Sequence, residues 1–325
     1  MRGSISAANS TLNTLVCFCW ASPKKGKAIR RINTLFLFIN FNRFILPIVL
    51  RKVKQIQVSE RLSPIFIHDF EQPIWQMALE PEKGLLALEL RDPKEASVSF
   101  SLLNLHTQTL VFDRYAFEED WWMSMVTIKD NLLLIKQYHD SQQPEKQALL
   151  AINIGTMEVQ WWLQNFQLLQ LNSLSVSGKE HGESESIVKH YEINSGHELA
   201  TDLVDKSNVQ EQSIKAKYPT HYDSESPHLE TIKSFIANYF NVKAVGACDY
   251  LEVEDLIVIS WFYSEGSSYA NVLSVIDSEG NIVIEEKIGT GLDAFAADTF
   301  FVLKNRLIFV SNKTQLIVYE LFEGA

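Results

Sequence analysis

The chain has 325 residues, enough for one large domain or two ordinary ones, and its hydrophobic fraction of 46% is normal for a globular protein. Charge is spread unevenly. Residues 1–55 hold ten of the 29 Lys and Arg residues and none of the 40 Asp and Glu residues, so they carry +10 and residues 56–325 carry −21. Because such a body repels a phosphate backbone, nucleic acid is excluded as a partner, and we expect an unidentified protein or small-molecule ligand.

Only three cysteines occur. Cys17 and Cys19 form a C-x-C pair near the N-terminus, and Cys248 lies far from both. This pattern indicates neither a disulfide framework nor a zinc ribbon, so we expect no metal site. It is compatible with a reducing compartment, and the expected location is cytoplasmic.

The segment of residues 1–60 is expected to lie outside the folded domain. An apolar run begins at Ile32 and ends at Leu50, between two basic clusters. Its length, about 19 residues, is near the minimum for a membrane span, but Arg43 and Pro47 are costly there. A secretory signal also has a basic start and an apolar core, yet PIVLRKVK offers no small-residue cleavage site. The remaining interpretation is disorder, or upstream sequence read in frame that is not native structure. Membrane anchoring through residues 32–50 is thus the alternative to the cytoplasmic location.

From residue 61 onward, short apolar runs alternate with period two and are separated by turn residues, which is typical of strands. Four hairpins share one form: an apolar strand, a polar turn and a second strand. The last apolar residues before their turns are spaced by 49, 39 and 83 residues, and the last step is about twice 41. A strand-only repeat of this length is typical of β-propeller blades. The hairpins are LLNLHTQTLVF (102–112), LAINIGTMEVQWW (150–162), KHYEINSGHELA (189–200) and LSVIDSEGNIVIE (273–285).

The strand-like segments group into blades of four, with two exceptions. The third blade shows only NSLSVSG, SIVKHYEI and HELATDLV, and the last shows only DTFFVLKN, RLIFVSN and QLIVYELF before the chain ends. The segment SPIFIHDF (63–70) precedes the first blade and has no other partner. Because an open ring would expose strand edges, we expect this segment to be the outer strand of the last blade and to close the ring.

Residues 204–240 interrupt the strand pattern. In SPHLETIKSFIANYF (226–240), Ser226 is suited to the N-cap and Pro227 to the first helical position, and apolar residues recur at helical spacing. The predicted fold is therefore all-β, a β-propeller of about five to six four-stranded blades with one helical insertion at about 204–240. The propeller domain is expected to span residues 61–325.

The turn of the second hairpin is similar to quinoprotein-type and WD40-like propeller repeats, which read apolar-D-x-x-T-G-x-x-x-W. Thr156 and Trp161 are in register with that pattern, while Asn153 replaces the Asp and Met157 the Gly. The resemblance implies blade architecture. The adjacent cysteine pair and the calcium ligands of quinone-dependent dehydrogenases have no counterpart here, so no cofactor is expected.

Short motifs spread over residues 63–322 carry a second resemblance. They are QPIW (72–75), LLALELRD (85–92), WW (121–122), YLE (250–252), SWFYS (260–264) and DTFFVLKNRLIFV (298–310). Together they are similar to an uncharacterised bacterial family found in Bacteroidetes, the domain of unknown function 4905. That resemblance implies no activity and no known site.

Candidate ligand-binding residues come from three places. Glu89 and Arg91 share one face of a strand, as a ligand clamp or as a surface ion pair of little energetic value. Trp122 follows an acidic run, and such aromatics bind sugars or cations, or pack inside blades. The remaining candidates are Tyr250 and Glu252 in CDYLEVED, which lacks the glycine of a calcium loop, and Asp298. The scattered histidines, including His221 and His228 beside the predicted helix, are interpreted as solvated loop residues.

The leading hypothesis is a non-catalytic binding scaffold, because propellers present loop-rich faces on a rigid frame. The competing class is an enzyme, a hydrolase or lyase with acidic residues at the channel mouth. It requires convergence in one pocket of Glu89, Arg91, Glu252 and Asp298. A membrane-anchored sensor or binding protein is the third class and depends wholly on residues 32–50.

Overall fold

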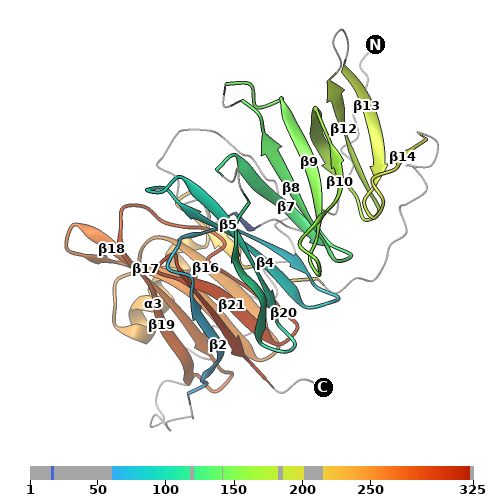
Figure 1. Ribbon diagram of the computed structural model, residues 1–325. Helices are drawn as coiled ribbons and strands as arrows, with labels where there is room; N and C mark the ends of the chain where they lie inside the picture. Colours follow the sequence, from blue (N-terminus) through green and yellow to red (C-terminus); the bar gives the residue numbers. More distant parts are fainter. Residues whose placement is uncertain are drawn as a thin grey trace, which may run out of the picture. The chain divides into compact units, whose positions relative to one another are not determined.

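A computed structural model describes residues 16–17, 61–117, 121–140, 142–181, 186–200 and 215–322. The apolar run 32–50 lies outside the described residues. The chain divides into two compact units. The first unit holds residues 1–17 and 72–214, and the second holds residues 18–71 and 215–325. Each unit is built from antiparallel sheets whose strands follow one another in chain order, except for β1 (Val16–Cys17) and β2 (Pro64–Asp69), each of which joins a sheet made of later strands (Figure 1).

The described part of the first unit contains three sheets, which we call blades 1 to 3. Blade 1 has β1 beside β3 and continues in the order β3-β4-β5-β6; blade 2 is β7 to β10, and blade 3 is β11 to β14. The strands are β1 (Val16–Cys17), β3 (Ile74–Glu80), β4 (Leu85–Asp92), β5 (Ser97–Asn104), β6 (Thr109–Tyr115), β7 (Met123–Lys129), β8 (Leu132–Tyr138), β9 (Gln147–Asn153), β10 (Val159–Leu163), β11 (Phe166–Leu171), β12 (Ser175–His181), β13 (Ser186–Glu192) and β14 (Glu198–Leu199).

The described part of the second unit contains two further sheets, blades 4 and 5, and a helix. Blade 4 runs β15-β16-β17-β18-β19, and blade 5 runs β2-β22-β21-β20. The four-stranded meander is the unit from which propellers are built, so the predicted all-β blade fold is confirmed, with five blades among the described residues. The elements are β2 (Pro64–Asp69), β15 (Thr220–Tyr222), α3 (Leu229–Phe240), β16 (Val245–Val253), β17 (Leu256–Glu265), β18 (Ser268–Ile276), β19 (Ile282–Leu292), β20 (Phe300–Leu303), β21 (Arg306–Ser311) and β22 (Gln315–Glu320).

The predicted N-terminal strand completes blade 5. β2 pairs antiparallel with β22, and Ile67 lies opposite Ile317. Just beyond the strand, the amide of Phe70 donates to the carbonyl of Thr314 at 3.0 Å, and the Phe70 side chain is fully buried. The last blade thus draws its outer strand from a segment nearly 250 residues earlier in the chain.

Blade 3 has a strand that the sequence pattern does not reveal. β11 pairs with β12, and it follows β10 after a tight turn in which Asn165 has a φ of 51°. The segment FQLLQL lacks strict period-two alternation because the pairing with β12 shifts register between Leu168 and Gln170. A bulge adds one residue to the strand, so the residues after it no longer follow the alternation of the residues before it.

The predicted helix is confirmed as α3, but it begins two residues later than its expected first position. His228 occupies the N-cap without a side-chain hydrogen bond. Ser226 instead exchanges hydrogen bonds with Asp223, to which its hydroxyl donates at 3.0 Å and whose amide donates back at 3.0 Å. The apolar face of α3 packs on blade 4 with Tyr222, Tyr250, Trp261 and other buried side chains; its buried residues are Leu229, Ile232, Phe235 and Ile236.

The repeated hairpin turns rest on one side-chain device. Asn153 Oδ1 accepts hydrogen bonds from the amides of Gly155 and Thr156, at 2.9 and 3.2 Å. In blade 1, Asn104 Oδ1 accepts hydrogen bonds from the amides of His106 and Thr107 in the same way. Asp277 plays this part in blade 4. Since an Asn or Asp side chain mimics a turn of backbone, these residues fix the reversals between the last two strands of the blades.

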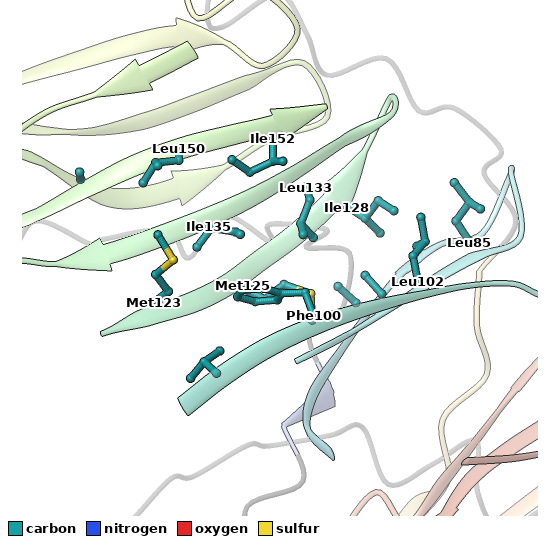
Figure 2. Close-up of a cluster of buried hydrophobic side chains, with 14 residues drawn as sticks. Leu85, Phe100, Leu102, Met123, Met125, Ile128, Leu133, Ile135, Leu150 and Ile152 are labelled. Carbon is teal, nitrogen blue, oxygen red and sulfur yellow. The ribbon is translucent and has the colours of Figure 1, made fainter. Parts of the chain in front are cut away.

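Neighbouring blades within a unit pack face to face through apolar side chains. Figure 2 shows this between blades 1 and 2, where Phe100 and Leu102 of β5 lie across from side chains of β7 and β8. A second buried cluster joins blades 2 and 3 around Phe166, and a third joins blades 4 and 5 around Phe300 and Phe309. The core is therefore a series of layers between sheets.

The second hairpin also ties blade 2 to blade 3. The indole Nε1 of Trp161 donates to the carbonyl of Ile193 at 2.8 Å, and Gln160 Nε2 donates to the carbonyl of Asn194 at 2.7 Å. Gly196 closes the turn of blade 3 at a φ of 68°, directly against the Trp161 ring. A side chain at Gly196 would meet that ring at 2.6 Å.

Removal of β2 should unfold blade 5. We compare a chain that starts at residue 61 with one that starts at residue 73; both lack β1, so they differ only in β2 and the segment after it. The shorter chain exposes the edge of β22 and loses the buried Phe70, whose truncation alone costs about 3–5 kcal/mol. We expect cooperative thermal unfolding of the longer chain and loss of cooperativity or aggregation of the shorter one. Equal melting curves would show that β2 is dispensable.

Gly196→Ala should destabilise the first unit by about 2 kcal/mol or more, because a left-handed conformation and a steric clash add together. Gly266→Ala is the matched control: its φ is 65°, but nothing lies within 4 Å of the added carbon. The control pays only the conformational cost of about 1 kcal/mol. Urea denaturation of both variants measures the difference, and equal midpoints would contradict the close packing of Trp161 on this turn.

Candidate functional site

The predicted Glu89–Arg91 pair lies at the junction of blades 1 and 2. Glu89 on β4 is fully buried. Its Oε1 accepts from Arg91 Nε at 2.6 Å, and its Oε2 accepts from the backbone amide of Met125 on β7, also at 2.6 Å. Ser124 Oγ donates to Oε2 at 3.4 Å. The carboxylate thus joins one blade to the backbone of the next.

Arg91 is held on several sides. Its two terminal nitrogens donate to the carbonyls of Trp121 at 3.2 Å and Met123 at 2.6 Å. Its guanidinium carbon lies 5.7 Å from the centre of the Trp75 ring and 5.3 Å from that of the Trp121 ring. Cation–π contacts of this kind add attraction to the ion pair. Arg91 therefore spans the same junction as Glu89.

Two more polar side chains of blade 1 form hydrogen bonds to the backbone of β7 and of the residue that follows it. Gln76 Nε2 donates to the carbonyl of Met125 at 2.8 Å, and Glu80 Oε1 accepts from the amide of Asp130 at 2.9 Å. β7 is an edge strand of its sheet, paired only with β8 among the described strands. Since buried backbone groups need partners, these side chains satisfy an edge that lies inside the unit.

Two tryptophan rings contact Arg91, and one of them is exposed. Trp75 is 47% exposed, although it is a large apolar side chain. It lies where the pairing of β3 and β4 shifts register, and its ring and that of Trp121 both contact Arg91. The predicted Trp122 is 51% exposed and follows Trp121 in the chain, but it makes no such contact with Arg91. We call Trp75, Arg91 and Trp121 the tryptophan–arginine surface.

A second buried carboxylate occupies the junction of blades 4 and 5. Asp249 on β16 is 1% exposed. Its Oδ2 accepts from both the amide and the hydroxyl of Thr299, each at 2.8 Å, just before β20. Its Oδ1 lies 2.6 Å from His221 Nδ1 on β15, the cross-strand neighbour of Asp249. The interpretation of His221 as a solvated loop residue is therefore wrong.

The environment of His221 favours its protonated form. Burial acts against the imidazolium, but the hydrogen bond and charge of Asp249 outweigh burial and raise the pKa of His221. The nearby carboxylates of Asp223 and Asp298 act in the same direction. Asp298 also has a φ of 54°, and its charge together with burial raises the pKa of Tyr218 to about 12.

The other predicted residues lie on the opposite face of β16. Tyr250 donates its hydroxyl proton to Glu252 Oε1 at 2.7 Å, and Tyr250 packs in the cluster under α3. Burial and that hydrogen bond raise the pKa of Tyr250. Because successive strand residues alternate between faces, Tyr250 and Glu252 point away from the face that carries Asp249. Within this unit, Glu252 and Asp298 thus belong to different environments.

The contacts within each unit join Glu89 with Arg91 in the first unit and Tyr250 with Glu252 in the second, where Asp298 lies near His221. Trp122 is exposed and joins neither pair. Asp249 was not predicted as a buried charge. Its signal was an acid that follows the small and apolar residues VGAC at the start of β16, because a buried carboxylate requires a donor elsewhere in the fold.

In the described part of the chain, no group of three or more His, Cys, Asp or Glu residues is arranged to hold a metal ion. No helix in the same residues is long and apolar enough to cross a membrane. The predicted membrane contact through residues 32–50 lies outside them.

The blades and their turns define a protein of the β-propeller class. Residues 79–161 match the family model described as a domain of unknown function, DUF4905, which confirms the resemblance over that part of the chain. The matched residues run from the end of β3 to Trp161 and include Glu89, Arg91 and Met125. None of the curated proteins matches the chain.

Several solved structures match the chain weakly, among them a TolB, a lyase and a protease domain. TolB from Acinetobacter baumannii is 10% identical over 78% of this chain, with a TM-score of 0.27, and the chain spans 56% of TolB. Oligogalacturonate lyase in complex with manganese is 9% identical over 82% of this chain and 99% of its own, with a TM-score of 0.28. The β-propeller domain of the Trilobed protease from Pyrococcus furiosus is 10% identical over 75% of this chain and 80% of its own, also at 0.28. At these values no activity or ligand transfers to this chain.

Glu89→Ala should cost about 3–5 kcal/mol of unfolding free energy, because Arg91 and the amide of Met125 both lose a buried partner. Glu265→Ala is the control. It removes an ion pair of similar length, 2.7 Å to Lys287, between two side chains that are more than 40% exposed, and such pairs are worth about 0–1 kcal/mol. Chemical denaturation compares the two variants. Equal losses would contradict the proposed tie between blades 1 and 2.

Proposed function

We propose that this protein is a non-catalytic binding scaffold whose partner, a peptide segment of another protein, contacts the tryptophan–arginine surface. The observation that carries the proposal is that, at one junction, the polar groups are engaged inside the fold while an apolar ring is exposed. Both carboxylate oxygens of Glu89 and three N–H groups of Arg91 are already engaged inside the fold. The ring of Trp75, which contacts Arg91, is left half exposed.

Exposed tryptophans on a rigid frame suit recognition. Tryptophan is enriched among the residues that dominate binding energy, because it buries a large area while losing few rotamers. Large apolar side chains exposed together often mark an interaction site. The sheet-to-sheet ties beneath Trp75 hold its ring in place before a partner arrives, which lowers the entropic cost of binding.

The charge pattern narrows the choice of partner. Residues 56–325 carry −21, so a neutral or basic peptide is favoured over an acidic one and over nucleic acid. The enzyme hypothesis has less support in the first unit, because Glu89 and Arg91 hold each other and the backbone and leave no carboxylate oxygen unengaged for proton transfer.

The proposal is tested by selection of a phage-displayed random-peptide library on the immobilised full chain, followed by affinity measurements with the enriched peptides. Trp75→Ala should weaken binding by about 30-fold, the loss typical of a central tryptophan. Trp162→Ala is the matched control, since Trp162 is 48% exposed on β10, outside the surface. Peptides that bind all three proteins equally, or a selection that enriches none, would contradict the proposal.

A further inference from the structure

The junction of blades 4 and 5 depends on a carboxylate whose hydrogen-bonding capacity is largely used. Asp249 presents one oxygen to the amide and hydroxyl of Thr299, both at 2.8 Å, and the other oxygen to His221 Nδ1 at 2.6 Å. Thr299 leads directly into β20, the edge strand of blade 5. The position of β20 against blade 4 thus depends on the hydrogen bonds that hold Asp249 in place.

An ionised carboxylate that is 1% exposed requires a compensating positive charge or strong donors. His221 supplies the charge when it is protonated. The His221 side chain is 31% exposed, so its ring can exchange protons with solvent while Asp249 remains buried. His221, which gains or loses the proton, is therefore reachable from solvent, whereas Asp249, which holds Thr299, is buried.

Three carboxylates from neighbouring elements act on His221 in the described part of the chain. Asp249 faces it from β16, Asp223 follows β15, and Asp298 precedes β20. Together they overcome the effect of burial and raise the pKa of His221 above its usual value. The pKa of the imidazole therefore lies above its usual value of about 6.5.

We infer that the His221–Asp249 pair is a pH-sensitive tie, in which a protonated His221 holds Asp249 on Thr299 and loss of the proton loosens β15 and the start of β20. The neutral ring keeps at most one uncharged hydrogen bond to the carboxylate. Charge-assisted hydrogen bonds are roughly twice as strong as neutral ones, so deprotonation weakens the tie without removing it. β15 is a three-residue edge strand immediately before the segment leading to α3, so the loosened region is small.

The sign follows from the raised pKa of His221. The stabilisation is fully present below the unfolded value of about 6.5, and it is lost as pH rises through the higher folded value. Blade 1 offers an internal comparison. There the buried Glu89 holds the amide of Met125 in the same way, but its cation is Arg91, which stays charged at all these pH values.

Amide hydrogen exchange on the full chain at pH 6 and pH 9, corrected for the intrinsic pH dependence, tests the inference. Peptides covering Thr299 and β15 should lose protection at pH 9 by a factor on the order of 3 to 10, while the peptide covering Met125 should keep its protection. Unchanged protection of Thr299, or equal loss at Met125, would overturn the inference.

A variant separates the histidine from other groups that titrate. His221→Gln retains an N–H donor without a titratable charge, so protection of Thr299 should become the same at both pH values. His197→Gln replaces an exposed histidine of the first unit and should leave the pH dependence of Thr299 intact. If His221→Gln fails to fold, an NMR titration of the wild-type His221 ring decides: a midpoint above 6.5 supports the inference, and one at or below 6.5 overturns it.

Discussion

The structure depends on how an edge strand that faces a neighbouring sheet satisfies its backbone. In each of two junctions, a buried carboxylate of one blade accepts the amide proton of the next: Glu89 from Met125, and Asp249 from Thr299. Apolar layers supply most of the burial between blades, but they are tolerant of sliding. A charge-assisted hydrogen bond to one particular amide is directional, so it fixes the register between sheets that the apolar layer only holds together.

The two junctions solve the same problem with different cations. Arg91 neutralises Glu89, donates hydrogen bonds to two carbonyls and contacts two tryptophan rings. Blades 1 and 2 are thus joined independently of pH. His221 neutralises Asp249 through one nitrogen only. The carboxylates also come from different strands of their blades, β4 and β16. A shared physical demand, rather than a repeated sequence position, therefore explains their common role.

Much of the fold could be predicted because its signals are local. Period-two alternation marks the long strands, and Asn153 and Asn104 mark the turns through bonds to amides two and three residues ahead. Even the partner of β2 could be inferred, since an incomplete last blade left one strand unpaired. Three strands were not predicted: β11 is bulged, β15 has three residues and β1 has two, so they carry too few regular alternations to be recognised.

The candidate site was predictable only as residue types. Glu89 and Arg91 were correctly paired because they lie two apart on one strand, but their other partners are backbone groups of Met125 and Met123, which no sequence motif encodes. The His221–Asp249 contact spans 28 residues with a helix in between, so spacing could not reveal it. The sequence shows an acid within a strand, but the partner of its carboxylate is set by tertiary structure.

The tryptophan pair of the second hairpin shows how packing and recognition divide between adjacent residues. Trp161 points inward, donates to the carbonyl of Ile193 and lies against Gly196, so its surroundings leave no freedom for another role. Trp162 points the other way and is exposed, as strand alternation requires. The pair at Trp121 and Trp122 repeats this division beside Arg91, but there the exposed Trp75 lies on the same guanidinium. That addition, rather than exposure alone, distinguishes the tryptophan–arginine surface from the isolated ring of Trp162.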